Sequence, residues 1–371
     1  MRPRDRVAWR RPARRKLRHG LLHGAAVAFS LTAIACAESP QTAKIRTPTL
    51  PEAPHARCDR YAAPDSRPHG SGTRRDPYRS VQDLADRLAP GQRGCLRAGV
   101  YREDITLRKG GTPGSRIRLT SAPGERATLK GIIAIADSAN DVEISSLRLE
   151  GTATGDTPSL QINGDRVVLR ANSITNGYTG TCVILGGAFP RYGLAVDAVV
   201  TRNRIYECGR LPRTNHDHGM YVEGTRGARI VDNLIYANAD YGIHLYPDAD
   251  GSYIAHNVIE GNGGGIVVAG ETGGEYPGSF ASDDNLIEEN VISGNVVKAG
   301  LETNWGDVRG RANTARRNCL GPAPGGPFDL DAGLSLEGNI EAEPTYVNRE
   351  AGDFRPRAGD TCRRIGAGPR P

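Results

Sequence analysis

Between His216 and Gly270 one short sequence pattern occurs three times, and it predicts much of the fold. It reads His216-Asp217-His218-Gly219-Met220-Tyr221-Val222-Glu223, then Tyr241-Gly242-Ile243-His244-Leu245-Tyr246, then Gly263-Gly264-Gly265-Ile266-Val267-Val268-Ala269-Gly270. In each line a glycine precedes apolar residues that alternate with other residues, and this period of two is the signature of a half-buried strand. The stretch therefore predicts three copies of one strand-bearing unit.

The unit recurs along the chain, marked each time by an asparagine with an apolar residue two positions later. These asparagines are Asn172, Asn203, Asn233, Asn257, Asn290 and Asn318, separated by 31, 30, 24, 33 and 28 residues. A second asparagine often follows about five positions on, at Asn176, Asn238, Asn262 and Asn295. A coil of three short strands needs about this length, whereas ankyrin or tetratricopeptide repeats need a helical period that this sequence lacks. The repeats predict an all-β parallel solenoid in which stacked asparagines bond from coil to coil.

Aligning the glycines Gly219, Gly242, Gly265 and Gly300 sorts the strand residues into two faces. The rows expected to point into the lumen are Met220, Ile243, Ile266 and Leu301, and Val222, Leu245, Val268 and Thr303. The rows expected to point outward are Asp217, Asp240, Gly263 and Lys298, then Tyr221, His244, Val267 and Glu302, then Glu223, Tyr246, Ala269 and Asn304. The outer face is expected to form a groove with polar walls and an exposed, nearly bare floor at the third coil.

Two longer excursions, 210–215 and 271–284, are expected to raise the walls of this groove. Binding residues often sit on long loops that a rigid scaffold holds in place. The alternative is that both excursions are ordinary variable loops of a solenoid.

The first 35 residues have the composition of an export signal. An arginine-rich start is followed by a 15-residue apolar run from Leu21 to Ala35, and Ala33-Ile34-Ala35 precedes Cys36. The run is shorter than the roughly 20 residues that span a bilayer. Two outcomes stay open, namely plain secretion, or cleavage at a lipobox-like site with lipidation of Cys36 as the only membrane contact. Residues 36–57, rich in Pro, Ala and Thr, are predicted to be a disordered tether to a domain at 58–371.

The leader also carries the basic charge of the chain. Residues 1–35 hold nine Lys and Arg against one Asp, a charge of +8, so removing them from a chain of +6 leaves −2. The exported part therefore lacks the positive charge on which a nucleic-acid-binding protein depends.

Six cysteines remain when Cys36 is set aside, and an even number in an exported chain indicates disulfides. Fifteen connectivities are available to six cysteines. Pairing of sequence neighbours suggests Cys58–Cys95, Cys182–Cys208 and Cys319–Cys362. No Cys-x-x-Cys pair is present, which argues against a zinc site.

The repeats are preceded by a short helix signal. Ser80 is expected to cap a helix with Asp83 at its third position, and the helix is expected to run to about Leu88 before Pro90-Gly91 stops it. This segment and the repeats resemble the pectate-lyase-like right-handed parallel β-helix proteins over roughly 72–319. The resemblance implies a right-handed β-helix solenoid with an N-terminal helical cap, which would close the lumen and the strand edge of the first coil. The tail after Gly321 lacks the repeat and is expected to be a C-terminal cap over about 321–371.

The motif His-Asp-His-Gly-Met-Tyr-Val-Glu, followed one coil later by Tyr-Gly-Ile-His, resembles the active-site coils of alginate-epimerase and polysaccharide-lyase β-helix families. Asp217 and His218 match the Asp and His of those families, although the proline between them is missing. The resemblance implies an extended polysaccharide, uronate-containing, as substrate, and β-elimination or C5-epimerisation as the reaction.

That chemistry needs a base, an acid and a group that neutralises the uronate carboxylate. We assign His218 as the base, Asp217 as the group that orients it, and Tyr221 or His244 as the acid, because imidazole titrates near neutral pH. Arg213 and Arg226 are the expected carboxylate binders. The remaining residues expected to line the groove are His216, Glu223, Tyr246, Lys298 and Glu302.

Three alternatives stay open. A glycoside hydrolase would need two carboxylates about 5–10 Å apart, for which Asp217 with Asp240 or Glu223 with Glu302 are candidates. A non-catalytic surface protein could bind glycan on the same face, since a fold does not determine function. The histidines could be a structural stack or, with His216, His218 and His244 together, a metal site.

Calcium held by carboxylates is a further open hypothesis, and the sequence identifies no cofactor with certainty. The protein is expected to be a monomer.

Overall fold

A computed structural model describes residues 57–187, 193–272, 279–366 and 368. The predicted signal peptide at 1–35, Cys36, and all but the last residue of the predicted tether lie outside these ranges. The described residues belong to one compact unit. In the described residues no helix is long and apolar enough to cross a membrane.

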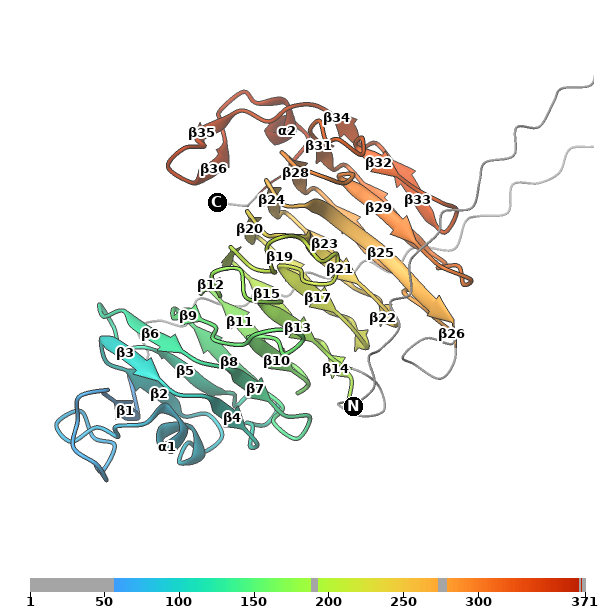
Figure 1. The fold of residues 1–371 in the computed structure, drawn as a ribbon. Coiled ribbons are helices and arrows are strands. Elements are labelled where there is room, and N and C mark those ends of the chain that lie inside the picture. Colours follow the sequence, from blue (N-terminus) through green and yellow to red (C-terminus); the bar gives the residue numbers. More distant parts are fainter. Residues whose placement is uncertain (1–56, 188–192, 273–278, 367, 369–371) are drawn as a thin grey trace, which may run out of the picture. The chain divides into compact units, whose positions relative to one another are not determined.

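The chain winds through three parallel sheets in turn, as Figure 1 shows. Sheet A consists, in spatial order, of β1 (Arg60–Ala62), β2 (Arg93–Leu96), β5 (Ile117–Ser121), β8 (Val142–Ser145), β11 (Val168–Arg170), β15 (Val199–Thr201), β19 (Arg229–Val231), β23 (Tyr253–Ala255), β27 (Leu286–Glu288), β30 (Asn313–Arg316) and β33 (Leu334–Glu337). Sheet B consists of β3 (Gly99–Arg102), β6 (Ala127–Lys130), β9 (Arg148–Glu150), β12 (Ser173–Thr175), β16 (Arg204–Tyr206), β20 (Leu234–Tyr236), β24 (Val258–Glu260), β28 (Val291–Ser293), β31 (Cys319–Leu320) and β34 (Ile340–Glu341).

Sheet C forms the third face. It consists of β4 (Ile105–Leu107), β7 (Ile133–Ile135), β10 (Leu160–Ile162), β13 (Val183–Leu185), β17 (Met220–Val222), β21 (Tyr241–Leu245), β25 (Gly264–Thr272), β29 (Leu301–Asn304) and β32 (Phe328–Asp329), with β26 (Ser279–Ala281) antiparallel to β25. Two small sheets are made of β14 (Ala195–Val196), β18 (Thr225–Arg226) and β22 (Ala249–Asp250), and of β35 (Tyr346–Asn348) and β36 (Asp353–Pro356). The predicted all-β parallel solenoid is confirmed.

The predicted inward rows are confirmed by the strand register. Met220, Ile243, Ile266 and Leu301 are aligned across four strands of sheet C, and so are Val222, Leu245, Val268 and Thr303. All eight side chains are buried, and the seven apolar ones belong to the continuous core of the solenoid. A one-residue slip would turn these rows outward, so their burial disfavours any other register of the coils.

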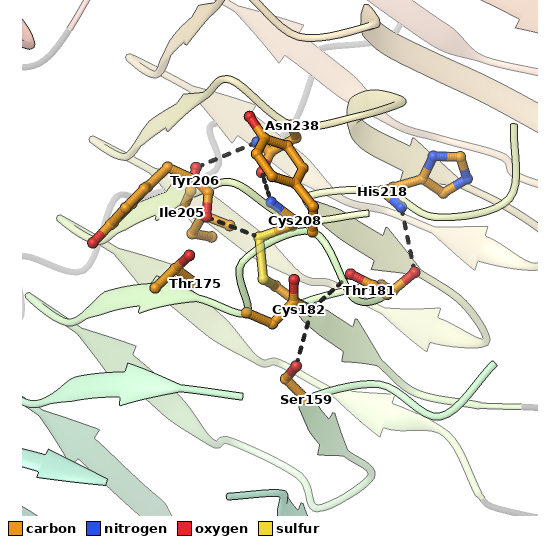
Figure 2. The surroundings of a disulfide bond; sticks show 12 residues. Ser159, Thr175, Thr181, Cys182, Ile205, Tyr206, Cys208, His218 and Asn238 are labelled. Carbon is orange, nitrogen blue, oxygen red and sulfur yellow. Dashed lines mark hydrogen bonds between the residues drawn. A yellow bond between two sulfur atoms is a disulfide. The ribbon is translucent and has the colours of Figure 1, made fainter. Parts of the chain in front are cut away.

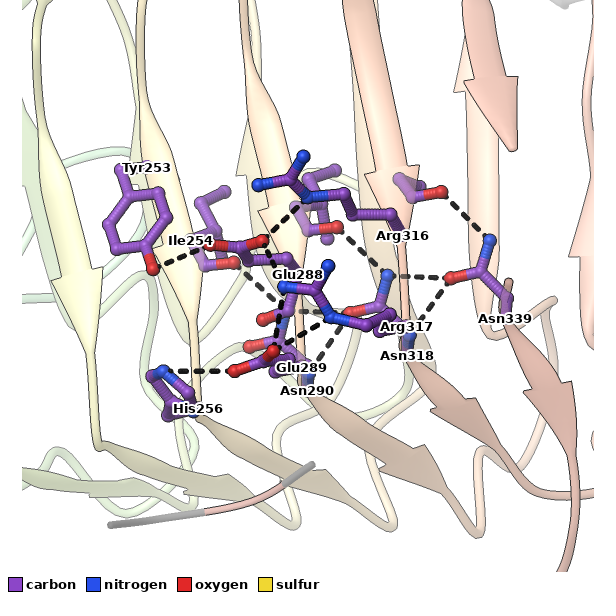
Figure 3. Close-up of polar contacts among 12 residues, drawn as sticks. Tyr253, Ile254, His256, Glu288, Glu289, Asn290, Arg316, Arg317, Asn318 and Asn339 are labelled. Atoms are coloured by element: carbon purple, nitrogen blue, oxygen red, sulfur yellow. Dashed lines mark hydrogen bonds and ion pairs between the residues drawn. The ribbon is translucent and has the colours of Figure 1, made fainter. Parts of the chain in front are cut away.

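The predicted asparagine ladder is also confirmed, at the turn between sheets A and B. The backbone and side-chain amides of Asn233 both donate to Asn257 Oδ1, at 2.9 and 3.0 Å, and those of Asn257 donate to Asn290 Oδ1 in the same way. Figure 3 shows the C-terminal end of the ladder, which continues through Asn318 to Asn339. The ladder side chains from Asn233 to Asn318 are fully buried, and each satisfies turn backbone that no sheet pairs.

The residue before each ladder asparagine takes a left-handed backbone conformation. The φ angle is 58° at Asp232, 57° at His256, 56° at Glu289 and 50° at Arg317. Successive coils therefore stack these side chains at one corner, where His256 Nε2 lies 3.3 Å from Glu289 Oε2 and Arg317 binds Glu289 in turn (Figure 3).

The N-terminal helix forms as expected. Helix α1 (Val81–Asp86) begins after Ser80, whose side chain accepts a hydrogen bond from the backbone of Asp83. It ends slightly before the predicted Leu88. Val81 and Leu84 are fully buried in the core at the first coil, so the helix covers this end of the lumen.

The C-terminal prediction needs a correction. The solenoid does not stop at Gly321, because β32, β33 and β34 pair in parallel with β29, β30 and β31. Only the segment after Glu341 leaves the coils, and its hairpin β35–β36 and helix α2 (Thr361–Arg364) pack on the outside of sheet B (Figure 1). The repeat is hard to recognise in the last coil because its loops are rich in Gly, Pro and Asp.

The three predicted disulfides are present, joining Cys58 to Cys95, Cys182 to Cys208 and Cys319 to Cys362. All six cysteines are buried. Three disulfides favour an oxidising compartment and therefore an exported protein.

Replacing Asn257 with alanine should lower the free energy of unfolding by about 2–4 kcal/mol, because the amides of Asn233 and the carbonyl of Ile230 lose their buried partner. Denaturant unfolding measures this. Asn304→Ala, at an exposed position on β29, should change stability by no more than about 0.5 kcal/mol. Equal effects of the two substitutions would contradict the ladder's role.

Candidate functional site

Five ring side chains gather on the outer surface of sheet C, around β17 and β21. They are His218, Tyr221, Tyr241, His244 and Tyr246. His244 stands at the centre, with ring centroids 4.5 Å from His218, 4.7 Å from Tyr221, 5.7 Å from Tyr241 and 5.4 Å from Tyr246. The register explains the central pair, since Tyr221 and His244 are neighbours in one outward row as predicted.

The two histidines are joined by a hydrogen bond of 2.8 Å between His244 Nδ1 and His218 Nε2. Burial lowers the pKa of His218 well below its usual value and that of His244 to about 3, and the charges of Lys298 and His216 act in the same direction. Both rings are therefore neutral at pH 7, and one of them must donate the shared hydrogen. Within the described chain, His244 Nε2 has no hydrogen-bond partner, so this nitrogen is the one left for a ligand.

The structure places His218, the predicted base, below the surface. Its ring is 0 % exposed, and its Nδ1 is buried without a partner in the described residues. The side chain lies beneath His244, which is partly exposed. His218 can therefore hold His244 in place but cannot meet a polymer on the surface.

The structure gives the carboxylate of Asp217 partners other than His218. This carboxylate accepts two hydrogen bonds from Arg210, at 2.6 and 3.1 Å, and one of 2.6 Å from Thr214. Asp217 is 2 % exposed, and its backbone donates to Asp240, which is also buried. Neither carboxylate faces a substrate, so the Asp217–Asp240 pair does not have the placement that a glycoside hydrolase needs.

Residues 208–218 form a loop whose two ends are fastened to the same preceding coil, as Figure 2 shows. At its start the Cys182–Cys208 disulfide and a 2.6 Å bond from Gly209 to the carbonyl of Gly180 hold it. At its end the backbone of His218 donates to Thr181 Oγ1 at 3.3 Å. The Arg210–Asp217 ion pair joins the two ends of the loop, which form its neck. The loop is therefore held at both ends, and these contacts, which we call the clasp, fix the position of His218.

The tip of this loop carries two of the predicted substrate-binding residues, Arg213 and His216, both exposed. Arg213 Nε donates to the carbonyl of Ala239 at 2.7 Å, which lays the side chain over the next coil. In the described chain its terminal nitrogens have no partner, so the planar end of the guanidinium is available to an anion.

A second polar group lies further along sheet C. Lys298 Nζ donates to the hydroxyl of Tyr241 at 2.7 Å, and the carboxylate of Glu302 acts electrostatically on both groups. Burial lowers the pKa of Lys298, while burial and the Glu302 carboxylate raise the pKa of Tyr241. Lys298 and Glu302 were predicted, and the structure places them together.

The groove floor is not bare. Val267 and Ala269 point outward in the predicted rows, yet each is only 1 % exposed because they pack against Tyr241 and Tyr246. The aromatic rings rather than glycine form the surface at this place. Tyr246 and Glu223 are partly exposed beside them.

Arg226 does not serve as a free carboxylate binder. It lies on β18 of the small sheet, and its guanidinium is bound by Asp248 at 2.9 Å and lies 3.6 Å from Asp250. Its charge is already balanced there.

No metal centre assembles within the described ranges, where no group of three or more His, Cys, Asp or Glu side chains is arranged to hold an ion. His216, His218 and His244 accordingly do not form the hypothesised metal site.

Sequence reasoning missed Arg210, Thr214 and Tyr241. Strand parity would point Tyr241 and His218 inward, but both precede the aligned glycines Gly242 and Gly219, and their rings join the outer cluster. The sequence did contain a signal for Tyr241, because it directly precedes Gly242 just as His218 precedes Gly219.

The model of the family described as "right handed beta helix region" matches residues 130–339, more than half of the chain. The chain belongs to this family. The predicted resemblance, handedness included, is therefore confirmed.

Pectate lyase Pel9A is similar in structure, with 14 % identity, a TM-score of 0.50, and coverage of 84 % of this chain and 87 % of that one. The complex of XylC with xylose has 10 % identity, a TM-score of 0.50, and coverage of 78 % and 71 %. At these identities the likeness concerns the fold of this β-helix protein alone. No curated protein matches it.

The clasp predicts different consequences for two disulfides. In the Cys182→Ser/Cys208→Ser variant the hydrogen-bonded imidazole signal of the His218–His244 pair should be lost or shifted in a nitrogen-15 NMR spectrum, because the loop neck opens. In the Cys319→Ser/Cys362→Ser variant it should persist. Both variants should melt earlier, since each bridge contributes about 3–4 kcal/mol in the chain-entropy model. An unchanged signal in the first variant would refute the clasp.

Proposed function

We propose that this protein binds an extended, uronate-containing polysaccharide across the outer face of sheet C and abstracts a proton from the carbon beside a uronate carboxylate. β-Elimination and C5-epimerisation share this step. The observation that carries the proposal is His244, a neutral and partly exposed imidazole that buried His218 holds by one nitrogen. The remaining nitrogen is free to accept a proton.

His218 acts as a positioning residue. When its Nε2–H donates to His244 Nδ1, the proton of His244 must be on Nε2, and when it accepts, His244 Nε2 carries the lone pair. The second arrangement is the reactive one, because only an unprotonated Nε2 can act as a base. Burial favours two neutral rings, so protonation does not remove the lone pair of the reactive arrangement in the neutral range.

The carboxylate beside the reacting carbon must be neutralised as negative charge develops. Arg213 and Lys298 are the cations that support this role. The charge of Lys298 contributes to the lowered pKa of His244, so the two side chains are within electrostatic range. Tyr221, with its ring 4.7 Å from that of His244, is placed to supply the acid. His216, Glu223, Tyr246 and Glu302 line the rest of the face.

The comparison with Pel9A supports the proposal only in its outline. That protein is named a pectate lyase, and its similar coils cover most of both chains. The same fold carries other activities too, so the site must carry the argument.

A panel of uronate and neutral polysaccharides tests the function. Uronate elimination produces an ultraviolet band from the unsaturated product, and epimerisation gives solvent hydrogen exchange at C5 without cleavage. Reducing ends without the band would indicate a hydrolase, and no product of any kind would indicate a binding protein. Either of the last two results contradicts the proposal.

His244→Ala should lower turnover by about 10²–10⁴-fold, the usual loss when a general base is removed. The matched control is His69→Asn, which changes an exposed histidine near the first coil and keeps a residue that tolerates its φ of 63°. Full activity of a folded His244→Ala protein would remove His244 from the mechanism.

The pH dependence follows from the lowered pKa of His244. Protonation disables the base, so the acid limb of kcat/KM, which reports the free enzyme, should fall near pH 3 rather than near 6.5. A bound uronate favours the imidazolium, so the acid limb of kcat should lie at higher pH. An acid limb of kcat/KM near pH 6.5 would show that a different group is the base.

A further inference from the structure

A second candidate site lies on sheet B, a different face from the ring cluster. A hollow of about 430 Å³ opens where the hairpin β35–β36 overhangs the outer surface of β16, β20 and β24. Its lining includes Leu234, which is partly exposed, and the edges of Val258 and of Phe354 of the hairpin, which are 1 % and 9 % exposed. In Figure 1 the hairpin lies at this side of the solenoid, close to β20 and β24.

Arg204 stands at the rim with its guanidinium already held in place. Its Nη2 donates to the hydroxyl of Tyr236 at 3.2 Å and to the carbonyl of Gly352 at 3.5 Å, and its Cζ lies 5.5 Å from the centre of the Tyr236 ring. In the described residues no carboxylate pairs with Arg204, and its Nε and Nη1 have no partner. An exposed guanidinium fixed in this way has lost part of its side-chain entropy before a ligand arrives.

The aromatic surroundings are continuous. Tyr206 and Tyr236 stack with ring centroids 5.1 Å apart and planes 11° apart, and Phe354 follows at 5.3 Å from Tyr236. Ring faces and edges offer an apolar surface to the carbon–hydrogen side of a sugar, while the arginine faces its charged group.

The charge at the rim favours an anion. Arg355 is bound to Asp353 at 2.6 Å, so this pair is balanced, and Arg204 leaves one net positive charge. The outer row of sheet B holds another exposed arginine, Arg148, but its charge is paired with Glu150 at 2.6 Å. Arg204 differs from Arg148, two coils away in the same row, because no carboxylate of the described residues forms an ion pair with it, although its charge helps to lower the pKa of Asp353.

We propose that this hollow is a second, non-catalytic binding site that takes an anionic sugar unit, with its carboxylate on Arg204 and its ring against Phe354 and Leu234. Guanidinium and carboxylate match in bidentate geometry, and a single pyranose fits the volume. The identity of the polymer rests on the proposed function, but the site itself does not. A site on sheet B and a reacting site on sheet C would hold one long chain, or two chains, at separate points.

Isothermal titration tests the proposal, with His244→Ala as the background so that no ligand is consumed. The probes are uronate tetrasaccharides, a sulfated tetrasaccharide and a neutral tetrasaccharide. We expect two uronate sites per chain. Arg204→Ala should remove one of them or weaken it by about 10- to 100-fold, the usual worth of a charge-assisted hydrogen bond. Arg204→Lys should fall between, because it keeps the charge and loses the planar fork.

Arg148→Ala is the matched control and should leave both sites unchanged. The sulfated probe separates a carboxylate-specific site from one for any anionic sugar, and the neutral probe should bind weakly at sheet B. The proposal is overturned if Arg204→Ala binds like its parent, if Arg148→Ala has the same effect, or if no anionic oligosaccharide binds. Turnover is measured separately with His244 intact. If Arg204→Ala loses the sheet B site but keeps its turnover, or if the sheet B site binds a uronate in a protein that turns over no polysaccharide, this inference and the proposed function are distinguished.

Discussion

The asparagine side chains at the turn between sheets A and B set the register on which the rest of the molecule depends. Each one ties its coil to the next through both its backbone and its side-chain amide, as Asn257 does to Asn290. A parallel sheet pairs only its strands, so its turns would otherwise leave buried amides without partners. With the coils fixed at this corner, residues at equal positions in successive coils become neighbours on every face.

The candidate site is a product of that register. Tyr221 and His244 meet because they occupy one outward row, and Val267 in the next coil is covered by the rings of the same cluster. The loop 208–218 adds what the coils cannot supply. It places His218 beneath His244 and extends Arg213 across the following coil. A rigid scaffold and one clasped loop are thus sufficient to assemble a neutral imidazole, a phenol and two cations.

Much of the fold could be predicted because its causes are local and periodic. The period of two and the aligned glycines identified the buried rows, and the recurring asparagines identified the coils. The last coil was missed, although Asn339 continues the ladder, because its strands β32 to β34 are short and separated by loops without the apolar pattern. Disulfide pairing followed sequence order because coils that are close in the chain are stacked in space.

The site was predicted less completely because it depends on loop residues outside the strands. Nothing local in the sequence announces that Arg210 pairs with Asp217, which removed the expected partner of His218. Alternation of faces also fails before the glycines, where the backbone turns and His218 becomes buried on the outer side. Arg226 looked available by position, but a small extra sheet brings Asp248 to it.

We propose above that the outer face of sheet C, around His244, holds an acidic polysaccharide. A crystal structure of the inactive His244→Asn protein soaked with a uronate oligosaccharide tests it most directly. We expect the oligosaccharide to lie across β17, β21 and β25. The carbon beside one uronate carboxylate should face residue 244, and that carboxylate should lie near Arg213 or Lys298. An oligosaccharide bound elsewhere on the solenoid, with the ring cluster uncovered, would contradict it.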